Sequence, residues 1–180
     1  RDGTFSVKLH KTRLLDPCGL LGTTEETVTV SDQFPMRRGR PVFAGYGDEL
    51  DGKPELWPMI LEKAYAALGR DASYNRMSSG GFAGIALQAL TGKKTLYRLA
   101  RRTSIDELAA LDRQGYAIVV NTTPTKHETL SGGHAYWVHR VDAAAKTVTL
   151  ANPYGPTRPL VTIGEDEFRR AMIFVQAAIP

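Results

Sequence analysis

The sequence predicts an α+β fold, in which antiparallel strands and helices pack alongside one another. Apolar and polar residues alternate with a period of two in several short runs, at 4–9, 27–30 and 132–155, a pattern typical of half-buried antiparallel strands. Apolar residues at helical spacing mark other stretches, at 55–68 and 104–111. A chain of 180 residues with these elements is long enough for one domain or two small lobes.

The N-terminal part begins with a predicted antiparallel strand pair. Its strands, residues 4–9 and 27–30, are joined through a loop at 17–22. Pro35 ends the second strand, because proline has no N–H to donate to a ladder. The stretch 41–52 is rich in glycine and predicts irregular structure.

Three helices are predicted before residue 112. In the first, residues 55–68, the apolar face repeats at i, i+4, i+7 and i+11 and consists of Trp57, Leu61, Ala64 and Leu68. The second covers residues 82–90. The third begins at Ser104, which forms a capping box with Glu107 three residues later.

The C-terminal part is richer in strands. Its predicted elements are a strand at 116–120, a polar loop at 121–131, the hairpin at 132–155, a strand at 160–163, a helix at 165–172 and a strand at 173–177.

The hairpin at 132–155 brings an imidazole and an amide together. If its turn is centred near Ala143 or Ala144, opposing residue numbers add up to about 286 to 288. His134 then lies beside Asn152 or one diagonal step from it. An asparagine oxygen that accepts from one ring nitrogen fixes the tautomer and aims the other nitrogen outward, as the third member of a catalytic triad does. This pair is half of a Cys-His-Asn site.

Two blocks of this hairpin resemble a known family. Gly-His-Ala-Tyr at 133–136 and Asn-Pro-Tyr-Gly at 152–155 are similar to the His and Asn blocks of calpain-type cysteine proteases. Four upstream stretches resemble the same family in the same order: VTVSDQFP at 28–35, ELWPMILEKAYA at 55–66, SYNRMSSGG at 73–81 and LTG at 90–92.

The resemblance implies a papain/calpain-like cysteine protease core, with an antiparallel β-sheet lobe and helices packed alongside. It also implies a division at Thr91-Gly92. Residues 1–92 would be the remainder of the lobe that holds the cysteine, and residues 93–180 would be the β-rich lobe that holds His and Asn.

The same resemblance implies roles for individual residues. His134 and Asn152 would be catalytic, and the substrate would be a protein or peptide. The loop at 122–133 corresponds to a calpain loop that lines the cleft. The residues expected to contact substrate are Gly132, Gly133, Tyr154, Gly80 and Gly81. Tyr154 stands where calpains carry tryptophan.

The nucleophile of such a site does not match any residue of this chain. The family's cysteine is preceded by Gln, followed by Trp and placed on a helix upstream of all these blocks. The only cysteine here, Cys18, lies between predicted strands without a following helix and without those neighbours, so a loop thiol is the better interpretation. We expect a Cys-bearing segment upstream of Arg1, or on a separate chain after processing, and we expect the 180 residues alone to be inactive.

Two classes of function are therefore open. The first is a calpain-like cysteine endopeptidase whose His and Asn lie in this chain. The alternative is a non-catalytic protein-binding module, a pseudoprotease that keeps the fold without the nucleophile.

Composition argues against other classes of function. The basic residues behind the net charge of +4 are spread over the chain, with one cluster at Arg37, Arg38 and Arg40 and another at 93–102. Neither has the interleaved aromatics of RNA-binding proteins, so nucleic-acid binding is not expected. No apolar run approaches the roughly 20 residues of a membrane span, and no membrane partner is expected. One cysteine and four histidines do not make a zinc site, and no cofactor is predicted. The acidic run at 165–167 could bind calcium, although a helix dipole explains it equally well.

Overall fold

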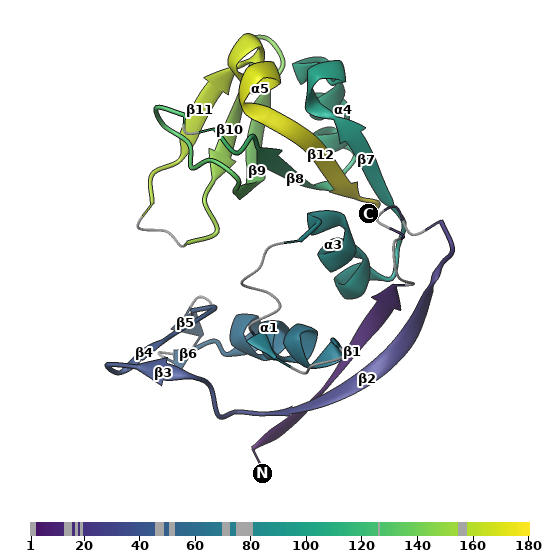
Figure 1. The fold of residues 1–180 in the computed structure, drawn as a ribbon, viewed down its shortest axis with the longest axis vertical. Coiled ribbons are helices and arrows are strands. Elements are labelled where there is room, and N and C mark those ends of the chain that lie inside the picture. The colour runs from purple at the N-terminus through teal and green to yellow at the C-terminus, as the bar shows by residue number, and fades with distance from the viewer. Residues whose placement is uncertain are drawn as a thin grey trace.

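The chain folds around a six-stranded antiparallel sheet, with a smaller layer made of a long strand pair and a helix (Figure 1). In this computed structural model the described residues are 3–12, 16, 18, 20–45, 49–50, 53–69, 73–74, 81–125, 127–154 and 158–180. The strand order in the large sheet is β11-β10-β9-β8-β12-β7. The predicted α+β class, with helices beside antiparallel strands, is confirmed.

The smaller layer is built on the predicted N-terminal strand pair. Strands β1 (Thr4–Thr12) and β2 (Thr23–Ser31) pair in antiparallel register along their whole length. Helix α1 (Trp57–Leu68) packs across them. Its contact is a small apolar cluster around Leu9, Val30 and Ala64. The Lys63 ammonium ties the helix to the end of β2 by donating to the Ser31 carbonyl at 3.0 Å.

Two short hairpins lie between β2 and α1. Strands β3 (Met36–Arg37) and β4 (Arg40–Pro41) form the first, and β5 (Glu49–Leu50) and β6 (Lys53–Pro54) form the second. The expectation of wholly irregular structure at 41–52 was therefore wrong. Strands of two residues contain too little alternation to be recognised in a sequence.

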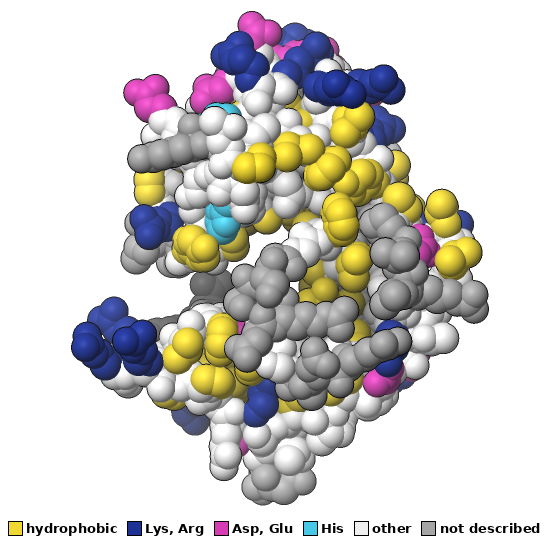
Figure 2. Space-filling model, viewed as in Figure 1, with side chains coloured by type: hydrophobic (Ala, Val, Ile, Leu, Met, Phe, Trp, Pro, Cys, Tyr) yellow, Lys and Arg dark blue, Asp and Glu magenta, His cyan; other side chains and the backbone are white. Residues whose placement is uncertain are grey.

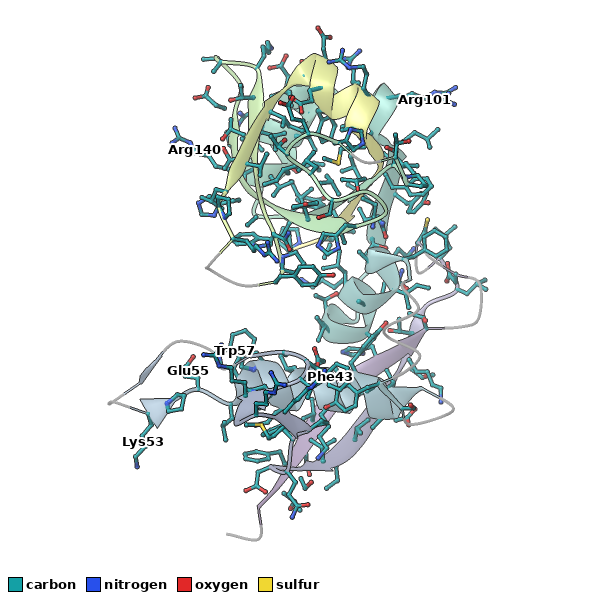
Figure 3. The ribbon with its side chains drawn as sticks, turned by 60° about the vertical axis from the view of Figure 1, so that its left-hand side comes forward. Phe43, Lys53, Glu55, Trp57, Arg101 and Arg140 are labelled. Atoms are coloured by element: carbon teal, nitrogen blue, oxygen red, sulfur yellow. The ribbon has the colours of Figure 1, made fainter. Side chains whose placement is uncertain are left out.

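The orientation of α1 also differs from the prediction. Trp57 belongs to the predicted apolar face, yet 56% of it is exposed, and its indole N–H donates to the Glu55 carboxylate at 2.9 Å (Figure 3). The buried side chains of the helix are Met59, Ala64 and Ala66. The sequence period correctly located the helix, but the face that is buried differs from the one predicted.

Helix α3 (Ala83–Thr91) connects the two layers. It packs against β1 on one side and against β12 on the other. At the second contact, the Gly84 N–H donates to the side-chain oxygen of Gln176, and the Gln176 amide donates to Asn121 Oδ1. Gln176 is fully buried. A hydrogen-bonded amide, and not only apolar packing, therefore joins the small layer to the sheet.

The large sheet and the helices packed on it contain most of the buried apolar residues. Its strands are β7 (Thr95–Leu99), β8 (Ala117–Thr122), β9 (Ala135–Asp142), β10 (Thr147–Ala151), β11 (Val161–Gly164) and β12 (Met172–Ala178). One short 3-10 helix, η1 (Ala100–Arg102), and two α-helices, α4 (Ile105–Arg113) and α5 (Glu165–Ala171), accompany it. A single cluster that includes Phe168, Leu108 and Leu150, all fully buried, joins the sheet to α4 and α5.

The helix cap predicted at Ser104 is present in this part of the structure. Ser104 caps α4, with its hydroxyl accepting from the Glu107 N–H at 3.2 Å and the Glu107 carboxylate accepting from the Ser104 N–H at 2.8 Å. The Ser104 N–H bond lowers the pKa of Glu107. Strand β8 continues two residues beyond the predicted 116–120, and this extension brings Thr122 to the site described next.

Candidate active site at the open end of the β9–β10 hairpin

His134 and Asn152 meet at the open end of one hairpin. His134 immediately precedes β9, and Asn152 immediately follows β10. The ring nitrogen Nε2 of His134 lies 3.1 Å from the side-chain oxygen Oδ1 of Asn152, which is hydrogen-bond distance. Both residues are partly buried. The predicted pairing of these two side chains is confirmed.

A β-bulge puts the two side chains on the same face. The register of β9 against β10 shifts by one residue, and His139 is left without a partner on β10. Beyond the shift, Leu150 pairs with Val138. Side chains alternate along a strand, so Asn152, two residues after Leu150, shares a face with His134, four residues before Val138. Without the extra residue, the alternation would turn His134 to the opposite face.

The hydrogen-bond network assigns the tautomer of His134. Asn152 Oδ1 also accepts from the backbone N–H of Tyr154 at 3.0 Å, so the atom that faces the imidazole must be the oxygen of the amide. An acceptor-only oxygen requires a proton on Nε2. In the neutral ring the lone pair then lies on Nδ1. Within the described part of the chain, no hydrogen bond to Nδ1 of His134 is present. The nitrogen that could act as a base is therefore available.

Two aromatic rings hold the imidazole in place. The ring centroid of Tyr154 lies 4.7 Å from that of His134, at an interplanar angle of 39°. The ring of Tyr136 lies nearly perpendicular to that of His134, with centroids 5.1 Å apart. The Tyr136 hydroxyl accepts from the Ser131 N–H at 2.9 Å and so fixes the preceding loop. Tyr154 is 69% exposed, so this ring contact lies at the surface.

Sequence reasoning missed the role of Thr122. Its hydroxyl accepts from the His134 N–H at 2.9 Å and donates to the Ser131 carbonyl at 2.7 Å, while its own N–H donates to the His134 carbonyl at 2.9 Å. Thr122 is only 2% exposed. A threonine at the end of an apolar strand, opposite the histidine, was the available signal. This residue clamps the backbone of His134 and does not face a groove.

The predicted glycine contacts have different surroundings. A side chain on Gly132 would lie 2.5 Å from the Pro124 carbonyl oxygen, so this glycine allows the loop to close on itself. Gly133 has a φ of 61°, a left-handed conformation that favours glycine. Gly81 is exposed just before α3. Gly80 lies outside the described residues. Their contact with a substrate stays a prediction.

Cys18 is far from His134. Its carbonyl accepts from the N–H of Thr95, the first residue of β7. In the sheet, β7 and β9 are separated by β12 and β8. Three strand spacings amount to about 14 Å. Cys18 therefore cannot form a thiolate–imidazolium pair with His134 in this arrangement.

The acidic residues at 165–167 open helix α5, where they complement the helix dipole. Glu165 also accepts a hydrogen bond from Arg169 one turn later, at 2.5 Å. Across the described ranges, no group of three or more His, Cys, Asp or Glu side chains is placed to hold a metal ion. None of the helices in the described part of the chain has the length and apolarity needed to cross a membrane.

Comparison with known proteins identifies the family. An α+β core with a His–Asn pair at the mouth of a hairpin is compatible with the cysteine protease class. Residues 21–159 match the family model described as calpain family cysteine protease. The chain belongs to the calpain family of cysteine proteases. A search of curated proteins gave no match.

Proposed function

We propose that this chain is the portion of a cysteine endopeptidase that supplies the His and Asn of a Cys-His-Asn triad. The observation that carries the proposal is the 3.1 Å contact between His134 Nε2 and Asn152 Oδ1, with the oxygen identified by the Tyr154 N–H. This network leaves Nδ1 as the proton acceptor, which is the role that general-base catalysis requires.

In the proposed mechanism, a thiol gives its proton to Nδ1 of His134, and the thiolate sulfur bonds to the carbonyl carbon of a peptide. The imidazolium returns the proton to the amine as the C–N bond breaks, which leaves a thioester. Water then attacks the thioester while Nδ1 accepts its proton, and the thiol leaves with a proton from the imidazolium. Asn152 keeps the ring oriented through these steps.

The thiol must come from a Cys-bearing segment outside these 180 residues, because Cys18 lies beside β7, three strands away from β9. The oxyanion hole would come from the same segment. We therefore infer that the 180 residues alone are inactive. Residues proposed to contact the peptide are Gly132, Gly133, Tyr154, Gly80 and Gly81.

The test is peptide hydrolysis by the full-length protein. His134→Ala removes the base and should lower kcat by about 10²–10⁴-fold. Asn152→Ala should give a smaller loss, because the base remains but its ring is no longer oriented. His10→Ala is the matched control, since this histidine lies in β1 against Gly92 and should leave cleavage unchanged. Unchanged cleavage by His134→Ala would end the catalytic proposal.

The position of Cys18 favours one alternative, a non-catalytic module that binds proteins on the same fold. The enzyme hypothesis and the binding-module hypothesis predict different sequences for the intact gene. A Gln followed by a Cys-Trp pair at the start of an apolar helix upstream of Arg1 supports the enzyme. An intact protein that lacks such a segment and cleaves no peptide supports the binding module.

A further inference from the structure

We propose that the β3–β4 hairpin recognises acidic side chains of the peptide substrate. This hairpin, residues 36–41, is called the arginine hairpin below because it carries Arg37, Arg38 and Arg40. The proposal rests on the proposed function, since it adds a preference for acidic peptides to the same site.

The three arginines are exposed and clustered. Figure 2 shows Lys and Arg side chains gathered on the side of the molecule that carries β3 and β4 in Figure 1. Among the ion pairs of the described residues, none involves Arg37, Arg38 or Arg40. The hairpin therefore presents a concentrated positive charge to an incoming ligand.

Two local features destabilise the arginine hairpin. Arg37 lies directly opposite Arg40 in the strand register, and like charges in directly opposed positions are destabilising. Arg38 has a φ of 53° and Gly39 a φ of 75°, a tight turn whose first position favours Asn or Gly over a long side chain. Two local conflicts in six residues indicate that a role other than folding selected these side chains.

The arginines line a shallow, open hollow together with two apolar residues. Its lining residues are Arg37, Arg38, Arg40, Pro41 and Val42. Guanidinium groups bind carboxylates through paired N–H donors, and the aliphatic stem of a glutamate can rest on proline and valine. This combination fits an acidic side chain better than a free inorganic anion, which has no apolar part.

The base of the arginine hairpin is held firmly. The Val42 N–H donates to the Pro35 carbonyl at 3.0 Å, and the Ala44 N–H donates to the Glu62 carboxylate at 3.0 Å. Phe43 stacks on Tyr74 with ring centroids 4.2 Å apart, beside α1 (Figure 3). The arginines therefore start from a fixed platform, which reduces the entropy that a bound peptide must remove.

The arginine hairpin and the proposed active site lie on the same side of the molecule (Figure 1). In Figure 1 it projects from the small layer on the side toward which the end of β10 points, and Asn152 follows β10 directly. Figure 2 shows that the surface is hollowed between these two parts. An extended peptide bound at His134 can therefore continue past the arginines, which would contact residues at a distance from the cleaved bond.

The test is binding of labelled peptides to the full-length protein carrying His134→Ala, which prevents turnover. Two peptides of identical length are compared, one with two Glu residues and one with Gln in their place. We expect the Glu peptide to bind about tenfold more tightly at low salt. The triple variant R37Q/R38Q/R40Q should reduce this ratio to about one, because the charge partners are gone.

The matched control removes the same charge elsewhere. Arg101 and Arg102 of η1 and Arg170 of α5 are exposed and distant from the arginine hairpin in the fold, so R101Q/R102Q/R170Q should keep the tenfold ratio. An unchanged ratio in the hairpin variant, or an equal loss in the control, overturns the proposal. Tighter binding of a single-stranded oligonucleotide, in competition with the Glu peptide, also overturns it.

The same variants separate this inference from the proposed function. If the His134-intact protein cleaves both peptides equally well, the acidic preference fails while the protease stands. If the Glu preference is present but neither peptide is cleaved, the protease proposal fails while the docking site stands.

Discussion

The two halves of the molecule differ in how completely they bury their apolar residues. From Lys93 onward, one cluster around Phe168 unites the sheet with two helices. Up to Gly92, the corresponding cluster contains three buried residues, Leu9, Val30 and Ala64. Of the thirteen large apolar side chains exposed among the described residues, nine belong to the first half and four to the second.

This difference suggests that the two halves of the molecule have different roles. The C-terminal half has a core of its own and carries His134 and Asn152 at the open end of the β9–β10 hairpin. The N-terminal half has apolar surface that further chain could cover, as we expect if the Cys-bearing segment packs there. The division at Thr91-Gly92 stays a prediction, although Gly92 does end α3 in a left-handed conformation, with a φ of 69°.

The largest effect on stability is expected from substitutions in the two apolar clusters. Phe168→Ala should destabilise the protein by about 3–5 kcal/mol, because a fully buried ring leaves a cavity in the large cluster. Leu9→Ala should cost about 2 kcal/mol, near the lower end of such changes, because the residues around it are only partly buried and can move inward. Urea unfolding of each variant measures both values.

The two tryptophans allow each half to be followed separately. Trp57 lies in the N-terminal half and Trp137 in the C-terminal half, and the chain has no others. We expect Trp57 fluorescence, measured in a Trp137→Phe variant, to change at lower urea than Trp137 fluorescence in a Trp57→Phe variant. Coincident transitions would contradict the comparison and make the two halves one cooperative unit.

A second prediction concerns the contact between the halves. Gln176→Leu leaves the Gly84 N–H without its acceptor and Asn121 Oδ1 without its donor. The expected cost is about 1–3 kcal/mol, the range for unsatisfied buried polar groups. Both tryptophan signals should shift, because the bond joins α3 to the sheet. A shift in only one of them would mean that Gln176 stabilises its own strand alone.

A third prediction concerns how the stability of the N-terminal half depends on pH. Burial raises the pKa of Glu62 above its usual 4.5, and the Ala44 N–H bond partly offsets this. The folded state then binds a proton more readily than the unfolded state, so the contribution of Glu62 to stability falls as pH rises from 4.5 through the folded pKa. Glu62→Gln keeps an acceptor for Ala44 and should remove this decline. We expect a difference below about 1 kcal/mol, because solvent screens the partly exposed carboxylate.

Thermal unfolding of both proteins from about pH 4 to pH 8 measures the effect. The midpoint of the variant should exceed that of the unchanged protein increasingly toward neutral pH. A difference that grows toward acid pH instead would reverse the assigned direction of the pKa.

The smallest effect is expected in the arginine hairpin. Arg38→Asn places a residue that tolerates positive φ at the first turn position and should stabilise the protein by about 0.5 kcal/mol. Arg38→Lys, which keeps both the charge and the unfavourable φ, is the control and should leave stability unchanged. Equal midpoints in urea for Asn and the original Arg would show that the turn is not strained.

The sequence predicted features that depend on neighbours along the chain. The capping box at Ser104 and the closeness of His134 to Asn152 followed from residue spacing alone. The hairpin prediction reached the right pair because the bulge at His139, which residue spacing did not show, shifts the later pairs into the predicted register.

Features set by distant contacts were not predictable in this way. Which side of α1 the strand pair covers depends on packing, so Trp57 was assigned to the wrong face. The clamp of Thr122 on His134 required knowing that β8 lies beside β9. The short strands β3 to β6 contain too few residues for any period to appear.

The bulge at His139 has a consequence for comparing relatives of this chain. The orientation of His134 depends on one additional backbone unit in β9 and not on the imidazole at position 139. Substitutions there should be tolerated, whereas shortening the strand by a single codon would rotate the base to the other side of the sheet. A homologue could thus retain both the histidine and the asparagine and still be inert. The length of β9 should therefore be compared, together with the identity of the two residues, when activity is inferred.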